Sequence, residues 1–220
     1  MFNMKNKKKY KVTFLLDANN LWIENFLKNQ NFNYSGKYIF KITKDPNSIL
    51  NQDIVFPLSY TKILSEDFLN KNQLTLIVHP SKLPKDKGFA PVQYQILKKK
   101  SKIFVSLIKA DKQVDSGNIY LREHFLLKGY ELSDEIRTMQ AKAVFRIIKS
   151  FLKKYPKLKN IPQKGKSTFN RRRTPGDSEL NINKSIKSQF NLLRTCDNNL
   201  YPAFFYHKKN KYILKILREK

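Results

Sequence analysis

Residues 10–16 read Tyr-Lys-Val-Thr-Phe-Leu-Leu and are followed by an acidic residue, Asp17. The run is rich in apolar and β-branched residues, which is typical of a strand buried in a sheet. Asn19 can cap the helix that follows, whose apolar face carries Leu21, Trp22, Phe26 and Leu27. A buried strand followed at once by an amphipathic helix favours an α/β fold, because such a helix covers one face of a sheet.

The alternation of strands and helices continues along the chain. Strands are expected at residues 37–42, 53–58, 74–78 and 102–110, another begins at residue 117, and helices are expected at residues 91–97 and 133–155. This order up to about residue 130 predicts a mostly parallel sheet flanked by helices. The later strands have the pattern of hairpins and predict an antiparallel edge on that sheet.

A polar segment at residues 157–166, which contains Pro162 and Gly165, predicts a linker. Beyond this linker we expect a helix and two strands, at residues 184–193, 203–206 and 212–217. The sequence therefore predicts a first domain at residues 1–156 and a small C-terminal helix-plus-hairpin extension at residues 167–220.

The chain is strongly basic, because 44 lysine and arginine residues outnumber 17 aspartate and glutamate residues and give a net charge of +27. A charge of this size suits nucleic acid or another polyanion as a partner. However, the basic residues are spread from Lys5 to Lys220 and do not gather on one periodic face. This dispersion favours a chain that uses lysine throughout over a dedicated nucleic-acid surface. The one dense arginine cluster lies at residues 171–173.

The contents of apolar residues, cysteine and histidine favour a globular protein over a membrane-spanning, disulfide-linked or metal-binding one. Apolar residues make up 40 % of the chain, which is enough to form a packed core, and no stretch is apolar for long enough to span a bilayer. The single Cys196 rules out an intrachain disulfide and fits a reducing cytoplasm. Three scattered histidines, His79, His124 and His207, lack the spacing of a metal-ligand set. We therefore expect a cytoplasmic protein without a metal and without a membrane partner.

Two polar residues follow strands at the place where an α/β sheet binds ligands, beyond the carboxyl ends of its strands. His79 directly follows the strand at residues 74–78, and Asp115 lies in a loop after the strand at residues 102–110. If these strands are neighbours, the two side chains can touch. A carboxylate beside a histidine fixes the imidazole tautomer and favours its charged form, which suits an acyl transfer to an amine that loses a proton. The alternative is a structural histidine, with Asp115 as a turn residue before Ser116.

Two motifs around this pair resemble a known family. Residues 79–91 read His-Pro-Ser-Lys-Leu-Pro-Lys-Asp-Lys-Gly-Phe-Ala-Pro and resemble the His-x-Ser-x-Leu-Pro…Gly…Pro signature of folate-dependent formyltransferases. Residues 114–119 read Val-Asp-Ser-Gly-Asn-Ile and resemble the Asp-x-Gly-x-Ile segment that follows in that family. Asp115 lies 36 residues after His79, a separation similar to that of the family. Residues 59–64 resemble the segment whose backbone helps to line the family's folate pocket.

The C-terminal part of the chain narrows the resemblance. Residues 168–178 include Thr-Phe and Arg-Arg-Thr-Pro-Gly-Asp-Ser, and residues 189–205 include Gln-Phe-Asn-Leu-Leu-Arg, Asp-Asn and Tyr-Pro-Ala-Phe-Phe. These segments are similar to short sugar N-formyltransferases, and most similar to those that act on UDP-linked 4-amino sugars such as precursors of pseudaminic acid. The resemblance covers nearly the whole chain from about Lys11.

The resemblance implies a Rossmann-like formyltransferase domain at residues 1–156 and an extension at residues 167–220 that completes the substrate site. His79 would act as catalytic acid and base with Asp115 as its partner, and 10-formyltetrahydrofolate would be the co-substrate. The folate would contact Tyr60, Ile63, Leu83, Pro84 and Asp111. The acceptor, a nucleotide-activated amino sugar linked to UDP or dTDP, would contact Ser81, Lys87, Gly88, Arg172, Arg173, Asp177 and Asn198. A homodimer stays open, because relatives often dimerise.

Residue chemistry alone leaves several of these substrate contacts open. The guanidinium groups of Arg172 and Arg173 match phosphate oxygens and suit a diphosphate, but they equally suit a solvated basic loop. Asp177 can instead serve as a turn or cap residue, and Asn198 can equally occupy a turn. Lys87 can attract an anionic substrate or only solvate its loop.

One position departs from the family pattern. The family has an asparagine two residues before the histidine, which helps to polarise the formyl oxygen, and here that position holds Ile77. Asn72 lies seven residues before His79 and cannot simply take its place. Loss of one oxyanion donor can lower the rate by about 10²–10³-fold. Three outcomes are open: a weak enzyme, an inactive relative, or another donor from a backbone N–H, Ser59, Thr75 or Ser81.

Two other functions stay as alternatives. A methionyl-tRNA formyltransferase-like enzyme would suit the charge, but such enzymes carry a substantial C-terminal β-barrel domain, and only about 60 residues follow the linker here. A non-catalytic, basic nucleic-acid-binding relative would bind its partner in a salt-sensitive way without turnover. A glycinamide ribonucleotide formyltransferase is disfavoured by the tail sequence. Nucleic acid is therefore not the expected partner, although the charge would permit it.

Overall fold

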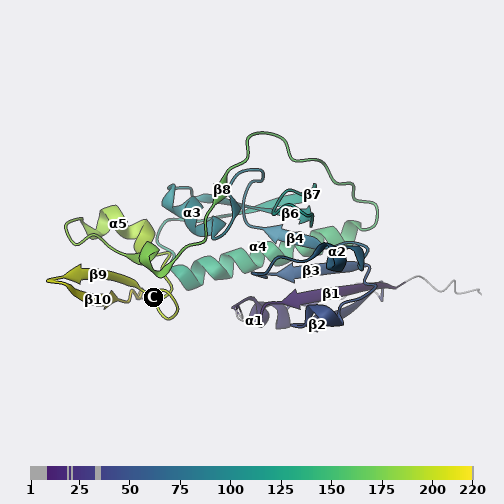
Figure 1. Cartoon of the computed structure of the whole chain (residues 1–220), viewed down its shortest axis with the longest axis horizontal. Coiled ribbons are helices and arrows are strands. Elements are labelled where there is room, and N and C mark those ends of the chain that lie inside the picture. The colour runs from purple at the N-terminus through teal and green to yellow at the C-terminus, as the bar shows by residue number, and fades with distance from the viewer. Residues whose placement is uncertain (1–8, 19, 21, 33–35, 220) are drawn as a thin grey trace, which may run out of the picture. The chain divides into compact units, whose positions relative to one another are not determined.

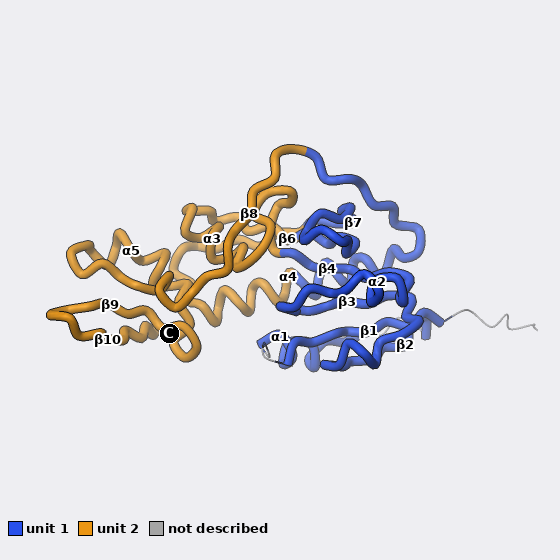
Figure 2. The backbone as a smooth tube through the Cα atoms, viewed as in Figure 1, with its two compact units in different colours: residues 1–79, 106–122, 144–164 blue, residues 80–105, 123–143, 165–220 orange. Residues whose placement is uncertain are grey.

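The computed structural model describes residues 9–18, 20, 22–32 and 36–219 (Figure 1). Asn19 and Leu21, which the sequence assigns to the first helix, lie outside the described residues. The chain forms two compact units that interleave along the sequence (Figure 2). The first unit contains Met1–His79, Ser106–Arg122 and Val144–Lys164, and the second contains Pro80–Val105, Glu123–Ala143 and Gly165–Lys220. The domain boundaries expected at residues 156 and 167 stay a prediction.

A parallel sheet forms the centre of the first unit. Strand β1 (Tyr10–Leu16) lies between β2 (Tyr38–Thr43) and β3 (Ile54–Leu58), and all three strands are parallel. A further parallel bridge joins Val55 to Thr75, just before β4 (Leu76–His79). Helix α1 (Trp22–Lys28) follows β1. The mostly parallel sheet flanked by helices is therefore confirmed, and β1 has the bounds expected from its apolar run.

Aromatic rings build the core of the first unit. Phe14 of β1 stacks on Phe56 of β3 with ring centroids 5.6 Å apart, and on Phe40 of β2 at 6.0 Å. Helix α4 (Ser133–Lys154) contributes Phe151, whose ring meets Phe56 edge-on at 6.2 Å. Because each ring buries a large apolar area, this stack fixes the C-terminal part of α4 on the sheet.

An antiparallel strand pair follows the parallel sheet. Strand β4 pairs with β6 (Lys102–Lys109), with Leu76 opposite Lys109 and His79 opposite Ser106. Strand β6 pairs in turn with β7 (Ile119–Leu126). Both β6 and β7 contribute residues to the two units.

Several short elements of the structure are not expected from the sequence. Helix α2 (Glu66–Asn70) begins after Ser65, whose hydroxyl accepts a hydrogen bond from the Phe68 N–H at 3.1 Å. In the second unit, β5 (Lys87–Gly88) and β8 (Phe169–Asn170) form a short parallel pair. Elements of this length are too short to show a hydrophobic period.

A helix and a hairpin form the C-terminal part of the second unit, which also contains α3 (Pro91–Leu97). Helix α5 (Ile186–Leu193) precedes the antiparallel strands β9 (Ala203–His207) and β10 (Asn210–Leu214). Their core includes Leu180, Leu193, Cys196 and Ala203. The expected helix-plus-hairpin extension is thus observed. None of the helices in the described part of the chain is long and apolar enough to span a membrane.

Replacing Phe14 by alanine tests the contribution of the aromatic stack. Phe14 is 1 % exposed, so Phe14→Ala leaves a cavity, and we expect the free energy of unfolding to fall by about 3–5 kcal/mol. Ile39 of β2 is 54 % exposed and provides the control, for which Ile39→Ala should change this free energy by about 0.5 kcal/mol or less. Urea denaturation followed by circular dichroism measures both values. Equal losses in the two variants would contradict this description of the core.

Candidate active site

His79 and Asp115 lie in contact in the first unit. His79 ends β4, and its Nδ1 atom lies 3.3 Å from Oδ1 of Asp115. The two side chains are only 6 % and 8 % exposed, so the pair is largely removed from water. An ionised carboxylate accepts hydrogen bonds and cannot donate them, so this contact assigns the proton to Nδ1 and the lone pair to Nε2. The arrangement provides a histidine of fixed tautomer that can accept a proton.

The route by which Asp115 reaches His79 differs from the one that the sequence suggests. Because β4 and β6 are antiparallel, β6 ends opposite Leu76, at the end of β4 that is remote from His79. The loop after β6 must therefore turn back toward His79. Gly117 permits this return, because a Cβ atom at that position would lie 1.8 Å from the carbonyl oxygen of Lys109. Asp115 itself has a left-handed backbone, with φ of 53°.

The segment expected to line the folate pocket is held by the turn that follows β1. The Asp17 carboxylate accepts hydrogen bonds from the Thr61 N–H, at 2.9 Å, and from the Thr61 hydroxyl. The Asn20 side-chain amide donates to the carbonyl oxygen of Ser59 at 2.8 Å. Tyr60 packs against the cluster of Leu15, Ile49, Val55 and Phe68. Burial and the nearby Asp17 carboxylate raise the pKa of the Tyr60 hydroxyl.

The two other residues of the first unit that were expected to contact folate differ in their surroundings. The Ile63 side chain is 82 % exposed, which leaves it accessible to a ligand. The exposed Asp111 carboxylate accepts a hydrogen bond from the N–H of the next residue, Lys112, at 2.7 Å. Their folate contacts stay predictions.

Ile77 leaves the first unit without the amide expected near His79. It lies opposite Ile108 in the β4–β6 pair, and its side chain has no hydrogen-bond donor. Asn72 is buried, accepts from the Gln52 N–H at 3.1 Å and donates to the Phe68 carbonyl oxygen at 3.0 Å, so its amide serves the local fold. The Thr75 hydroxyl is buried and has no partner among the described residues. At about 3.3 Å per residue, however, Thr75 lies about 13 Å along the strand from His79, too far to share a reacting atom.

In the second unit, the loop after His79 is anchored by a buried carboxylate. Asp86 is 2 % exposed and pairs with Lys98 and with Lys100, the latter at 3.0 Å. Burial opposes ionisation of Asp86, but these two ammonium groups outweigh it and lower the pKa of the carboxyl. Gly88 has φ of 84°, and a Cβ atom there would lie 2.5 Å from the carbonyl oxygen of Asn170, so the β5–β8 pair requires glycine.

The other residues of this loop that were predicted to bind folate or substrate are mostly buried. The Ser81 hydroxyl donates to the Lys85 carbonyl oxygen at 2.8 Å, and Leu83 is 1 % exposed. Lys87 is 6 % exposed, and its ammonium group lies 5.5 Å from the centre of the Phe169 ring. Pro84 accepts a hydrogen bond at its carbonyl oxygen from the Thr168 N–H at 3.3 Å. These contacts fix the loop, and the predicted substrate and folate contacts of its residues stay predictions.

The arginine cluster of the second unit is organised around Asp177. Arg171 pairs with the Asp177 carboxylate, which also accepts from the Thr174 N–H at 2.6 Å in a capping box. The pairing with Arg171 and the bond from Thr174 hold the pKa of Asp177 well below its usual range. Arg173 donates to the Asp177 carbonyl oxygen at 2.7 Å, and the Arg172 guanidinium lies 4.6 Å from the centre of the Phe89 ring. Asp177 thus has the capping role that the sequence left open, and Arg172 is placed by an aromatic ring.

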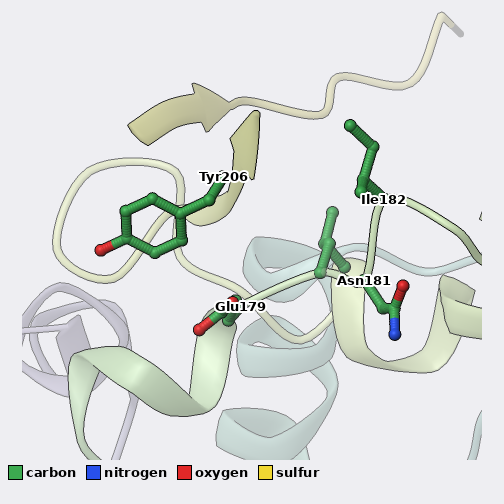
Figure 3. A pocket seen from close by; sticks show the side chains of 5 residues that line it. Glu179, Asn181, Ile182 and Tyr206 are labelled. Atoms are coloured by element: carbon green, nitrogen blue, oxygen red, sulfur yellow. The ribbon is translucent and has the colours of Figure 1, made fainter. Parts of the chain in front are cut away.

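The second unit also contains Asn198 and a pocket that lies elsewhere, lined by other residues. The Asn198 side chain donates to the Ile216 carbonyl oxygen at 2.7 Å and accepts from the Ile216 N–H at 3.1 Å, so both of its polar atoms are engaged by backbone. Figure 3 shows a pocket of about 400 Å³, which is lined by Glu179, Leu180, Asn181, Ile182 and Tyr206. None of the residues predicted to bind folate or substrate lines this pocket.

Two residues that hold predicted site segments have no role that the sequence predicts. Asp17 holds Thr61, and Gln163 donates hydrogen bonds to the carbonyl oxygens of Asp115 and Gly117. The only sequence signal for Asp17 is its place at the end of a buried strand, and Gln163 stands in a segment with the composition of a linker. In the described part of the chain, no group of three His, Cys, Asp or Glu residues is placed to hold a metal ion.

Comparison with known proteins gives a family match over most of the chain. The family model for formyl transferase matches residues 5–146. Methionyl-tRNA formyltransferase of Borrelia garinii is 34 % identical over 128 residues, which cover 56 % of this chain and 41 % of that protein. The chain thus spans less than half the length of this relative.

Solved structures of low sequence identity share the fold. A methionyl-tRNA formyltransferase from Clostridium thermocellum superposes with a TM-score of 0.79 at 21 % identity, covering 96 % of this chain and 94 % of that one. A sugar N-formyltransferase from Shewanella sp. gives 0.75 at 15 % identity, covering 96 % and 98 %. HypX from Aquifex aeolicus in complex with tetrahydrofolic acid gives 0.66 at 15 % identity, covering 94 % and 37 %.

Adding a methyl group at Gly117 tests the return loop. Gly117→Ala would push a Cβ atom into the Lys109 carbonyl oxygen, and we expect the free energy of unfolding to fall by about 1–3 kcal/mol, as for other overpacked sites. At Gly176 the nearest atom to a Cβ would be the Thr174 hydroxyl at 3.7 Å, so Gly176→Ala is the matched control and should be close to neutral. Urea denaturation measures both variants. A Gly117→Ala protein as stable as the control would contradict the close approach of these two backbones.

Proposed function

Because the chain belongs to the formyl transferase family, we propose that it transfers the formyl group of 10-formyltetrahydrofolate to the amine of a nucleotide-linked amino sugar. The observation that carries this proposal is the buried contact between His79 and Asp115. It supplies the proton acceptor that an amine requires when it attacks a carbonyl carbon. The bound tetrahydrofolic acid in the HypX structure supports folate as the formyl carrier.

In the proposed reaction, His79 moves one proton twice. Its Nε2 atom accepts the proton that the sugar amine loses as the new C–N bond forms, and it returns this proton to the folate nitrogen as the old C–N bond breaks. Asp115 stays ionised, orients the imidazole through Nδ1 and stabilises the imidazolium in between. No atom of the protein forms a covalent bond with the formyl group.

The formyl oxygen gains negative charge in this reaction and needs stabilisation. Ile77 supplies none, and the Asn72 amide is engaged by backbone groups. We propose that the imidazolium of His79 stabilises this charge, with a backbone N–H as a second donor. Since a missing oxyanion donor costs about 10²–10³-fold, we expect a slower formyl transfer than in an enzyme with the family's asparagine.

The folate would lie against the segment that Asp17 holds. The exposed Ile63 side chain offers an apolar surface, which suits a flat heteroaromatic ring. Tyr60, Leu83, Pro84 and Asp111 are the further proposed contacts.

The nucleotide sugar would be recognised by residues of the second unit. Arg172 lies over the Phe89 ring, and a guanidinium fixed in this way can form two parallel hydrogen bonds to a phosphate. Arg173, Lys87, Gly88 and Ser81 are the further proposed contacts, whereas Asp177 and Asn198 would act by shaping their own loops. The sugar N-formyltransferase from Shewanella sp., which this chain covers almost completely, supports a sugar as acceptor.

A second candidate acceptor is methionyl-tRNA. The Borrelia and Clostridium proteins act on it by name, and the net charge of +27 suits a polyanion. A steady-state assay with 10-formyltetrahydrofolate separates the two candidates when UDP- and dTDP-amino sugars are compared with methionyl-tRNA. We expect a formylated sugar nucleotide, detected by mass spectrometry. Formyl-methionyl-tRNA without any formylated sugar would overturn the proposed acceptor.

The proton-transfer pair is tested by two substitutions. We expect His79→Gln and Asp115→Asn each to lower kcat by about 10²–10⁴-fold, because both remove the oriented proton acceptor. His207→Gln in the exposed part of the hairpin is the control and should keep the kcat of the unmodified protein. Initial rates of formyl transfer, at saturating concentrations of both substrates, measure the effect. A His79→Gln protein with full activity would contradict the mechanism.

Asp17 provides a separate test of the folate segment. Asp17→Asn replaces the charged acceptor of two hydrogen bonds, and charged hydrogen bonds contribute about 1.5–3 kcal/mol. We therefore expect the KM for 10-formyltetrahydrofolate to rise about 10-fold or more, with a smaller change in the KM for the sugar. Asp45→Asn is the control, because Asp45 accepts a backbone N–H at an exposed turn of the same unit. Equal KM values for folate in the two variants would count against this segment as its binding site.

A further inference from the structure

We propose that Gln163 is a positioning residue for the transfer reaction, because it holds the backbone around Asp115 so that the carboxylate meets Nδ1 of His79. The inference rests on the proposed function for its kinetic consequence, but the contact between Asp115 and His79 can be observed without turnover. Both hydrogen bonds that Gln163 donates go to backbone carbonyl oxygens, so it acts on the backbone around Asp115 and not on the two side chains.

The amide nitrogen of Gln163 donates two hydrogen bonds. Its Nε2 atom lies 2.8 Å from the carbonyl oxygen of Asp115 and 2.9 Å from that of Gly117. A primary amide has two N–H groups, so this one side chain can satisfy both carbonyl groups at once. Two backbone positions on either side of Ser116 are therefore tied to the same atom.

The turn at Asp115 needs such support. Its φ of 53° lies in the left-handed region, which residues with a Cβ atom rarely adopt and keep only where their surroundings hold them. The close approach of Gly117 to the Lys109 carbonyl oxygen limits the loop on one side. The side-chain amide of Gln163 holds the other side of this turn, because it binds the backbone carbonyl oxygens of Asp115 and Gly117. Without this amide the loop would keep its packing contact and lose its orientation.

The position of Gln163 is fixed by a short antiparallel pairing. Ile161 and Ile119 exchange both backbone hydrogen bonds, at 2.8 and 2.9 Å. These two backbone hydrogen bonds set the register of the segment after α4, so that Gln163 arrives next to a residue 48 positions earlier in the chain. A separate, exposed hydrogen bond from the Asn118 side-chain amide to Oδ1 of Asn160, at 3.0 Å, links the same two segments.

The side-chain oxygen of Gln163 allows a substitution that removes only the two donated hydrogen bonds. Its Oε1 atom is buried and has no hydrogen-bond partner among the described residues. Replacing the amide by an apolar group of similar length therefore removes the two donated hydrogen bonds and breaks no accepted one. Gln163→Met is such a replacement. Asn160→Ala is the matched control, because it removes the neighbouring hydrogen bond between the same two segments and leaves the carbonyl groups of Asp115 and Gly117 paired.

The kinetic experiment compares these variants in the formyl-transfer assay. We expect Gln163→Met to lower kcat by about 10–100-fold, the loss typical of a misplaced catalytic group, while the KM values for both substrates stay within about 2-fold. Asn160→Ala should keep both parameters. Gln163→Asn retains the amide on a shorter side chain and should recover part of the lost kcat. A folded Gln163→Met protein with unchanged kcat, or an equal loss in Asn160→Ala, would overturn the inference.

The second readout is the tautomer of His79 by ¹⁵N nuclear magnetic resonance, with the signal assigned from its loss in His79→Gln. In the unmodified protein and in Asn160→Ala we expect the Nδ1–H form, and in Gln163→Met a mixture of both tautomers. Gln163→Ala serves in the same way if the methionine variant does not fold. An unchanged tautomer in a folded variant would contradict the positioning role. This readout stays valid if no acceptor is formylated, which would overturn the proposed function alone.

Discussion

The antiparallel register of β4 and β6 sets the geometry on which the candidate site depends. Because Leu76 lies opposite Lys109, the chain leaves β6 far from His79 and has to travel back before a carboxylate can reach the imidazole. Gly117 makes this return possible, and Asp115 completes it in a left-handed backbone conformation. The proposed proton transfer therefore depends on the direction of a strand pair as much as on the identity of two polar residues.

The few acidic side chains of this basic chain serve largely as structural anchors. Asp86 holds two lysines beside the loop that follows His79, and Glu131 pairs with Arg194 at 3.6 Å with both side chains buried. Backbone donors and the Arg194 cation outweigh the effect of burial and lower the pKa of Glu131. The 17 acidic residues are too few to pair with most of the 44 lysine and arginine residues, so such anchors leave the chain strongly basic.

The parts of the fold that depend on local pattern are predictable from the sequence, and those that depend on distant contacts are not. The apolar runs locate β1 and β3, and Pro91 locates the start of α3. The contact between His79 and Asp115 follows from motif order, but the turn that creates it depends on a register between strands. Gln163 has no local signal, because its role exists only when Ile161 pairs with Ile119.

That last pairing has a consequence for the order in which the protein forms during synthesis. Strands β1 to β3 need only residues 10–58, so they can assemble early as the chain leaves the ribosome at about 5–20 residues per second. The turn around Asp115 has to wait until α4 and residue 163 have emerged, because its backbone partners come from there. The nascent chain thus contains all residues of the parallel sheet for several seconds before it contains the residue that holds the turn around Asp115.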